Sequence, residues 1–493
     1  MGYKYFLSRR WAIAAIVLAA FAALSYISVV IFCDYPFSMD EYNYLYQAKI
    51  FASGRMYLNA DGKLRELFEV YTIFLDGKLF SKYPAGFSLI LSLGERLGFS
   101  GFVNPLISAG TLFVIYLLGA ELAGSLFSLL GVVIIASSSY FLGYGASYFS
   151  HPAVLFFSSL GFLFYQKCKS LGKNKFLYFC ALAIGAVVFI RPLDAFCLWL
   201  ALSFGFLRAK LPGKFRTFFL FCILSAWGAA ALVIYNKILT GKYGIVSYSV
   251  WGSDFKILYG KKSYMLPPME NFRLFLNIYM YNIKALFYPL LTKYFLPYIA
   301  CWAPFIALSF YCFKQAGDKF KSLRAVFLFY CFLVIAVYNI TPSVLPQYPS
   351  WPQYGARYWY ILIAPLAIFI IDGIRALRGI APKRVFLFIF TACIIAQAWQ
   401  VVRDFDKYSQ RFKFVQETRE DINRSCPEKS IIFLRASPNF EKEAPFFVRW
   451  SDFKRNPFLN AKRLYLISGK NIDAIRAHYP DYSVCNYSFG AQK

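Results

Sequence analysis

The chain has 493 residues, of which 59% are hydrophobic and only 16% are charged, and its mean hydropathy is +0.49. A soluble protein of this length needs a largely polar exterior, so this composition excludes a soluble globular chain. The formal net charge of +28 does not indicate nucleic-acid binding, because the basic residues cluster in short gaps between apolar runs.

Apolar runs long enough to cross a bilayer recur from residue 11 to about residue 402. The first run resembles a signal peptide, but it is too long for one and lacks a small-x-small cleavage motif, which indicates a retained helix. We therefore predict an all-α polytopic membrane protein with about eleven transmembrane helices. The expected crossings are 11–32, 103–120, 126–144, 149–166, 176–191, 193–208, 216–236, 285–311, 324–341, 358–376 and 384–402.

The distribution of lysine and arginine predicts the orientation in the membrane. The gaps 165–175, 207–216, 313–324 and 374–384 are strongly basic, and basic loops remain in the cytoplasm, where they also suit anionic lipid headgroups. A cytoplasmic N-terminus and eleven crossings place all four gaps inside and the C-terminus outside. We expect a multi-pass protein of the inner (plasma) membrane.

This orientation places several segments outside the membrane, and two of them contain predicted secondary structure. In the first outer loop, 33–102, the stretch 81–98 is apolar but broken by proline and glycine, which predicts a juxtamembrane helix in the outer interface. The last segment, 403–493, lacks long apolar runs and predicts a small extracytoplasmic α/β domain after a membrane domain of 1–402. Its expected strands are 430–436 and 463–469, followed by a helix at 471–480. The outer segments 237–284 and 342–357 complete this face.

The stretch "FSMDEYNYLYQAKIF" (37–51) places Asp40 and Glu41 directly after the first apolar run. A carboxylate at such a position often marks only a solvated helix end. Alternatively, it serves as a general base, because a low-dielectric boundary raises carboxyl basicity and a positioned base accelerates a reaction about 10²–10⁴-fold. The pair alone does not decide between these interpretations.

Several cationic candidates fall on the same predicted outer boundary. Lys82 either extends to the headgroups or binds an anion, and Arg191 either pairs with Asp194 or serves a site. Arg357 has no acid nearby in the sequence, and its planar guanidinium suits a lipid-borne phosphate. His151 begins a predicted helix and either makes a local hydrogen bond, contacts phosphate or transfers a proton.

The order of these motifs resembles the GT-C class of membrane glycosyltransferases, in particular the protein O-mannosyltransferases and the lipid A aminoarabinose transferases. The likeness covers roughly residues 1–400. The "DE" pair is followed by "QAKIFASGRMYLNA", and "SKYPAGFSLIL" stands where relatives have a Lys-Pro-Pro element, with Tyr83 after Lys82 and Ala85 in place of the second proline. "RPLDAF" and "GARYWYILIAPLAIF", which contains Arg357 and Tyr358, resemble later motifs of bacterial members.

The resemblance implies a sugar donor carried on a polyprenyl phosphate and used on the extracytoplasmic face. Asp40 matches the acidic base, and Lys82 and Arg357 match cations near the donor phosphate. Arg191 and His151 also map to the donor side, whereas Glu41 remains an alternative base. We expect no required metal or other cofactor.

We therefore predict an inverting glycosyltransferase whose acceptor hydroxyl belongs to a lipid, a glycan or a protein. Two alternatives remain: a ligase or polymerase that uses polyprenyl-diphosphate-linked glycans, and a flippase or transporter. Transporters typically show repeated halves and charges at the bilayer midplane, and neither feature is visible here. Cys426 and Cys485 lie in the same predicted outer domain and pair only if the compartment is oxidising.

Overall fold

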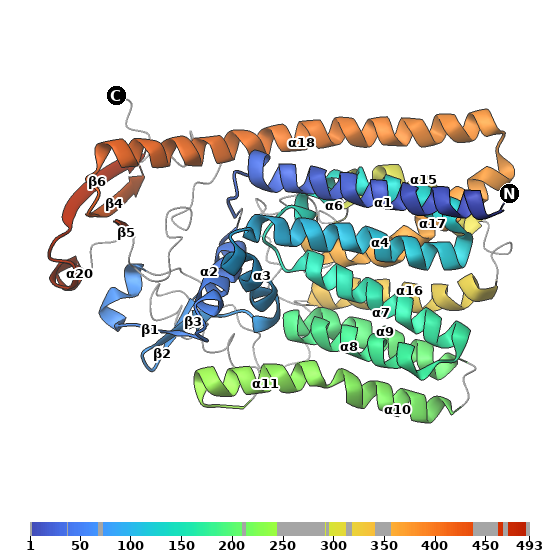
Figure 1. Ribbon diagram of the computed structural model, residues 1–493, viewed down its shortest axis with the longest axis horizontal. Helices are drawn as coiled ribbons and strands as arrows, with labels where there is room; N and C mark the ends of the chain where they lie inside the picture. The colour runs from blue at the N-terminus through green and yellow to red at the C-terminus, as the bar shows by residue number, and fades with distance from the viewer. Residues whose placement is uncertain are drawn as a thin grey trace.

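The structure is a computed structural model, and it describes residues 2–36, 38–67, 72–209, 213–243, 291, 295–311, 318–340, 356–436, 462–466 and 472–489. Most of these residues lie in long helices that run side by side (Figure 1). The expected outer segments 237–284 and 342–357 lie mostly outside the described residues.

The bundle consists of helices packed side by side (Figure 1). Its α-helices are α1 (Gly2–Tyr26), α4 (Val103–Ala123), α5 (Ser125–Ala136), α6 (Ser139–Gly145), α7 (His151–Leu171), α8 (Asn174–Ile190), α9 (Pro192–Arg208), α10 (Lys214–Ser225), α11 (Trp227–Thr240), α14 (Leu296–Ile299), α15 (Ala303–Tyr311), α16 (Asp318–Ile340), α17 (Ile363–Ile380) and α18 (Lys383–Ser425). Of these, α10 and α11 follow one another end to end (Figure 1). Short segments of other helix types extend the α-helices: the π-helix η1 (Ile27–Ile31) and the 3₁₀ helices η3 (Ser100–Phe102), η6 (Ala300–Trp302) and η8 (Arg357–Leu362).

In the described part of the chain, five helical segments are long and apolar enough to cross a membrane. They become six if the pair α5 and α6, bent by 71°, counts as one broken span. Further apolar helices, such as α8, are shorter than this criterion. The predicted helical, multi-pass membrane architecture is confirmed in this coarse form, and the number of eleven crossings stays a prediction.

The two ends of the bundle differ in chemistry. His151 begins α7 at one end, and α7 has 21 residues, so the basic stretch after it lies about 30 Å away at the other end. The start of α1 lies at that same basic end, while the non-helical elements gather at the opposite end (Figure 1).

The first loop folds as a compact unit rather than as a helix alone. It contains α2 (Met39–Ala52), β1 (Leu58–Asn59), η2 (Gly62–Leu67), β2 (Thr72–Leu75), β3 (Lys78–Ser81) and α3 (Ala85–Leu97). The strands form an antiparallel sheet in the order β1-β3-β2, in which Ile73 pairs with Phe80. Asp76 and Gly77 both have positive φ and close the β2–β3 hairpin. This sheet is not among the elements predicted from the sequence.

The predicted juxtamembrane helix corresponds to α3. Its outer face exposes Leu89, Leu93 and Leu97, while Phe87 and Leu91 on the opposite face are buried in the main core. Such an apolar outward face suits a helix lying at a membrane surface.

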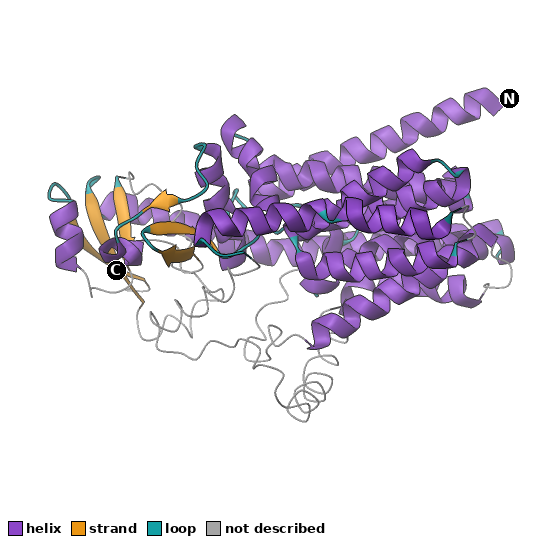
Figure 2. Cartoon of the chain, turned by 90° about the horizontal axis from the view of Figure 1, so that it is seen from below, coloured by secondary structure: helices purple, strands orange, loops and turns teal. Residues whose placement is uncertain are grey.

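The C-terminal part begins with α18, which continues without a break through the expected boundary at residue 402. Its 43 residues extend about 64 Å along the edge of the bundle (Figure 1). Beyond it lie β4 (Ser430–Ala436), β5 (Arg463–Leu466), α20 (Ile472–His478) and β6 (Ser483–Phe489). The strands form a parallel sheet in the order β5-β4-β6, which lies at the same end of the molecule as the first-loop sheet (Figure 2). The predicted strands and helix are thus present.

Two features attach the C-terminal sheet to the rest. A disulfide joins Cys426, just after α18, to Cys485 in β6, which answers the question that the sequence left open. In addition, Leu464 and Ile475 pack in one apolar cluster with Leu64 and with Ile50 of α2. The sheet therefore contacts the first loop directly.

A buried ion pair locks α15, α16 and α17 together. Arg324 lies 2.5 Å from Asp372, and both side chains are almost completely buried. Ser309 donates a hydrogen bond to Asp372 at 2.9 Å, and Arg375 also pairs with this carboxylate. Because unpaired charges are costly in such an interior, these contacts fix the relative positions of the three helices.

Candidate active site

The two adjacent acids at the start of α2 have different environments. Glu41 is almost fully buried and caps the helix: its Oε2 accepts from the Ser38 backbone N–H at 2.7 Å, and the Ser38 hydroxyl accepts from the Glu41 N–H at 3.3 Å. Its Oε1 accepts from the Tyr148 N–H at 2.8 Å. Both carboxylate oxygens of Glu41 are therefore occupied by backbone donors.

Asp40 instead faces side chains from distant parts of the sequence. Its Oδ2 lies 2.8 Å from Arg357 Nη1, and its Oδ1 accepts from the Tyr83 hydroxyl at 2.5 Å. The Asp40 side chain keeps 18% of its surface exposed and that of Arg357 keeps 20%. This carboxylate is accessible, whereas that of Glu41 is not.

One face of α2 positions the residues around Asp40. Asn43 and Gln47 follow Asp40 at helical spacing and bind the end of β3: the Ser81 N–H donates to Gln47 Oε1 at 2.8 Å, and the Ser81 hydroxyl contacts Asn43 Oδ1. The Tyr83 N–H in turn donates to the Ser81 hydroxyl at 3.0 Å. This network holds the segment that contains Lys82 and Tyr83 against α2.

The charges of Lys82, Asp40 and Arg357 influence one another. Lys82 is 6% exposed, and burial lowers its pKa to about 8, although Asp40 opposes this shift and Arg357 adds to it. Burial acts to raise the pKa of Asp40, but the positive charges of Arg357 and Lys82 and the hydrogen bonds from Tyr83 and Arg357 outweigh it, so that pKa is lowered. At neutral pH Asp40 is ionised and most Lys82 is charged.

Aromatic residues surround Arg357. It donates to the Tyr358 hydroxyl at 2.7 Å, and its guanidinium lies 5.6 Å from the Phe149 ring. Tyr358 stacks on Tyr338 with the ring centroids 4.7 Å apart. Arg357 is thus fixed in one orientation at the start of η8.

Arg191 lies beside the same aromatic pair. Its guanidinium is 5.7 Å from the Tyr358 ring, pairs with Asp194 and donates to the Tyr338 hydroxyl at 3.1 Å. Tyr338 donates to the other Asp194 oxygen at 2.5 Å. Arg191 therefore forms the expected ion pair with Asp194. This ion pair lies beside Tyr358, next to the site.

His151 is buried next to these groups. Its ring lies 5.5 Å from Phe149 and 6.0 Å from Tyr358, and only 2% of the residue is exposed. Within the described residues, neither ring nitrogen has a hydrogen-bond partner. Because a buried unpaired imidazole is costly, this nitrogen pair is a candidate for contact with a ligand.

The structure thus brings most of the predicted site residues to one end of the bundle: Asp40, Lys82, Tyr83, His151, Arg191, Arg357 and Tyr358. Glu41 instead caps the start of α2.

Two further tyrosines of this region, Tyr44 and Tyr338, were not predicted from the sequence. Tyr44 packs on Tyr83 at 4.5 Å and accepts from the Ser150 hydroxyl at 3.0 Å. Burial raises its pKa to about 12, with smaller effects of nearby Arg191 and Asp40. Nothing in the sequence distinguishes these two from the other tyrosines among 38.

The chemistry of this end favours an anionic ligand. Lys82, Arg191 and Arg357 outnumber Asp40 and Asp194, and two of the three cations are guanidiniums suited to phosphate. Among the described residues, no group of three or more His, Cys, Asp or Glu side chains is arranged to hold a metal.

No family model and no curated protein matches the sequence significantly. Solved structures do. ArnT from Cupriavidus metallidurans, the lipid A aminoarabinose transferase, matches at a TM-score of 0.52 and 11% identity when bound to undecaprenyl phosphate, over 96% of this chain and 89% of ArnT. Its apo form matches at a TM-score of 0.53 and 10% identity over the same shares.

The fold is similar to that of ArnT, a GT-C glycosyltransferase. An oligosaccharyltransferase from Archaeoglobus fulgidus aligns at a TM-score of 0.48 and 10% identity, over 91% of this chain and 60% of that protein. At 10–11% identity to ArnT, the GT-C likeness shows the fold, and the function depends on the side chains described above.

Proposed function

We propose that this GT-C protein is an inverting glycosyltransferase that moves a sugar from a polyprenyl-phosphate-linked donor to an acceptor hydroxyl. The observation that carries the proposal is the convergence of one accessible carboxylate, Asp40, with Lys82 and Arg357 at one end of a membrane bundle. ArnT, which has the same fold, binds undecaprenyl phosphate. The acceptor can be a lipid, a glycan or a protein.

The reaction is a single displacement at the anomeric carbon of the donor. The acceptor oxygen forms the new bond on one face while the bond to the phosphate oxygen breaks on the other, and the configuration inverts. The acceptor proton passes to Asp40, and polyprenyl phosphate leaves with the bonding electron pair. A positioned base and electrostatic stabilisation of the leaving phosphate supply the acceleration.

The donor itself prepares Asp40 for this role. In the free site Arg357 and Lys82 lower the pKa of Asp40, which makes its carboxylate a weak base. A phosphate bound between the two cations neutralises part of their charge, so the pKa of Asp40 rises towards that of a stronger base. Base activity is then switched on only when the donor is present.

Other residues hold the donor phosphate and orient the sugar. Lys82 and Arg357 contact the phosphate, and His151 donates one ring N–H that has no other acceptor in the described structure. Arg191 adds positive charge through its position beside Tyr358, and the stacked Tyr338–Tyr358 pair supplies an aromatic surface for a sugar ring. Tyr83 keeps Asp40 in place. The cations replace a metal in stabilising charge, so we expect transfer to continue in the presence of EDTA.

We place the site on the extracytoplasmic side. The basic stretches lie about one helix length away at the other end of the bundle, and basic loops face the cytoplasm. The disulfide Cys426–Cys485 joins the end of α18 to β6, at the end of the molecule that holds the strands (Figure 1), and disulfides persist in oxidising compartments. The N-terminus is then cytoplasmic and the C-terminal sheet extracytoplasmic, in the plasma or inner membrane.

The test is reconstitution of the purified protein with a panel of polyprenyl-phosphate sugars and release of free polyprenyl phosphate as the readout. Transfer from a monophosphate-linked donor supports the proposal. Transfer only from diphosphate-linked glycans would support the ligase or polymerase alternative, and movement of intact donor between leaflets without release would support a flippase.

A further inference from the structure

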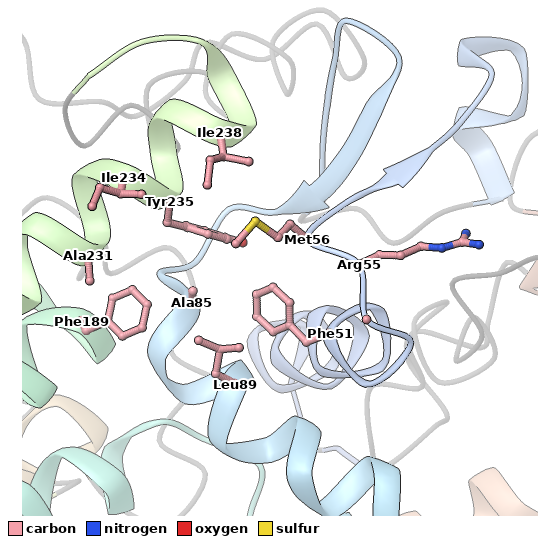
Figure 3. A pocket seen from close by; sticks show the side chains of 11 residues that line it. Phe51, Arg55, Met56, Ala85, Leu89, Phe189, Ala231, Ile234, Tyr235 and Ile238 are labelled. Atoms are coloured by element: carbon pink, nitrogen blue, oxygen red, sulfur yellow. The ribbon is translucent and has the colours of Figure 1, made fainter.

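A second feature lies on the opposite face of α3 from the site. An apolar cavity of about 430 Å³ lies between the end of α2 with the residues that follow it, α3, the end of α8 and α11 (Figure 3). It is lined by Phe51, Gly54, Arg55, Met56, Ala85, Leu89, Phe189, Ala231, Ile234, Tyr235 and Ile238.

The cavity is separated from the Asp40 site by a close backbone contact. Gly86 lies so near α8 that a Cβ there would come within 2.7 Å of the Phe189 carbonyl oxygen. Ala85 and Leu89 face the cavity, whereas Phe87, on the other side of α3, packs against Tyr44 at 5.2 Å. No proposed function of the catalytic site uses this space.

Part of the cavity lining is apolar and exposed. Leu89 of α3 and Ile234 and Ile238 of α11 line it and are 40%, 59% and 39% exposed. All three residues are apolar, and they belong to helices that present apolar side chains outward. A lipid chain can therefore enter from the side without crossing water.

The cavity contains one buried polar group, the hydroxyl of Tyr235. Tyr235 is 4% exposed, its ring meets that of Phe51 at 6.1 Å, and it extends from α11 towards Met56 (Figure 3). Within the described residues its hydroxyl has no hydrogen-bond partner. A buried hydroxyl without a partner is unfavourable, and the ester carbonyl of a lipid is an acceptor that could satisfy it.

The rim is basic. The Arg55 side chain extends away from the apolar lining (Figure 3), and Lys78 is held at the edge because its Nζ donates to the Ile238 carbonyl at 3.1 Å. Cations beside a lipid-facing apolar cavity complement an anionic headgroup attached to an apolar chain.

We propose that this cavity binds one acyl chain of an anionic glycerophospholipid, with the ester carbonyl on Tyr235 and the headgroup beside Arg55 and Lys78. The site is separate from the donor site, and occupation of it ties α11 to α2 and α3. The proposal does not depend on the glycosyltransferase function, because its readout is lipid binding.

The experiment uses the full-length protein in phosphatidylcholine vesicles that contain phosphatidylglycerol with a photoactivatable acyl chain. After irradiation, mass spectrometry locates the labelled peptides. We expect label on Phe51–Met56, Leu89 and the Ala231–Ile238 segment. Ala231→Trp fills the cavity and should abolish this label, whereas Ala230→Trp places the same side chain on an exposed neighbouring position outside the lining and should leave it unchanged.

Two milder variants keep the test decisive if Ala231→Trp fails to fold. Tyr235→Phe removes only the hydroxyl and should reduce the label, and Arg55→Gln should reduce phosphatidylglycerol labelling about fivefold, the effect of one basic residue at a lipid surface. Photoactivatable phosphatidylcholine should label the cavity more weakly than phosphatidylglycerol. Unchanged labelling in Tyr235→Phe, equal labelling by both lipids, or loss of label when polyprenyl phosphate is added would overturn the proposal; the last result would assign the cavity to the donor chain.

Discussion

Asp40→Asn is the most informative single substitution, because it removes the charge of the proposed base and almost nothing else. The asparagine has the same shape, and its amide oxygen can still accept from either Arg357 or Tyr83, which lie 2.8 and 2.5 Å from the carboxylate. Arg357 also keeps its bond to the Tyr358 hydroxyl. The geometry of the site should therefore survive.

The expected effects on rate and on stability differ in size. Loss of a positioned base lowers turnover about 10²–10⁴-fold, equivalent to roughly 3–5 kcal/mol in the activation barrier. The ion pair that is lost is about one-fifth exposed on both sides, and the asparagine still offers Arg357 a neutral acceptor, so the loss of stability should stay below the roughly 3–5 kcal/mol of breaking a fully buried pair. The loss of kcat should thus be larger than the loss of stability explains.

The assay measures release of polyprenyl phosphate by the reconstituted variant, together with its thermal unfolding. We expect kcat to fall at least about a hundredfold, with KM for the donor unchanged or lower, because an anion beside the bound phosphate has been removed. Glu41→Gln is the matched control: Glu41 accepts from two backbone N–H groups, so it should lower stability while the folded protein keeps its kcat. Wild-type kcat in Asp40→Asn, or a greater loss of kcat in Glu41→Gln, would refute the assignment of the base.

Three further predictions concern charge and covalent structure. Because the pKa of Lys82 in the free site is about 8, donor affinity should fall about tenfold per pH unit above 8 as the free amine loses its proton; Lys82→Arg should abolish this dependence in a binding titration, and a flat wild-type profile would contradict it. Asp372→Asn removes the acid from buried Arg324 and should lower the free energy of unfolding by about 3–5 kcal/mol; unchanged thermal stability in detergent would show that the pair is dispensable. Replacing Cys426 and Cys485 by serine opens a covalent loop of 59 residues and should destabilise the C-terminal sheet by about 4 kcal/mol, which limited proteolysis detects; equal protection of both proteins would contradict it.

The helical architecture could be predicted from the sequence because lipid imposes a simple pattern on it. Apolar length and basic gaps indicate bundle helices without knowledge of tertiary contacts. The first-loop sheet was missed, although Asp76-Gly77 between apolar residues is a hairpin signal. Each strand of that sheet is only 2–4 residues long, so its periodicity is too short to stand out in an apolar sequence.

Of the candidate site, too, the sequence predicts some residues and not others. Asp40, Lys82 and Arg357 are identifiable because a charge beside an apolar run requires a reason, but Asp40 and Arg357 are 317 positions apart in the sequence, so their pairing cannot be predicted from it. The separate role of Glu41 was present in the sequence, because Ser38 and Glu41 have the spacing of a capping box. Tyr44 and Tyr338 carry no local signal. Their roles arise only from the packing of α2 and α16 against other elements.

Binding of polyprenyl phosphate tests most directly whether Lys82 and Arg357 hold a lipid phosphate. Titration calorimetry in detergent compares the wild-type protein with Lys82→Ala and with Lys242→Ala, which removes an exposed lysine just after α11. The loss of one charged hydrogen bond, about 1.5–3 kcal/mol, predicts roughly 10–150-fold weaker binding by Lys82→Ala and unchanged binding by Lys242→Ala. Equal affinities in all three proteins would contradict the proposed donor site.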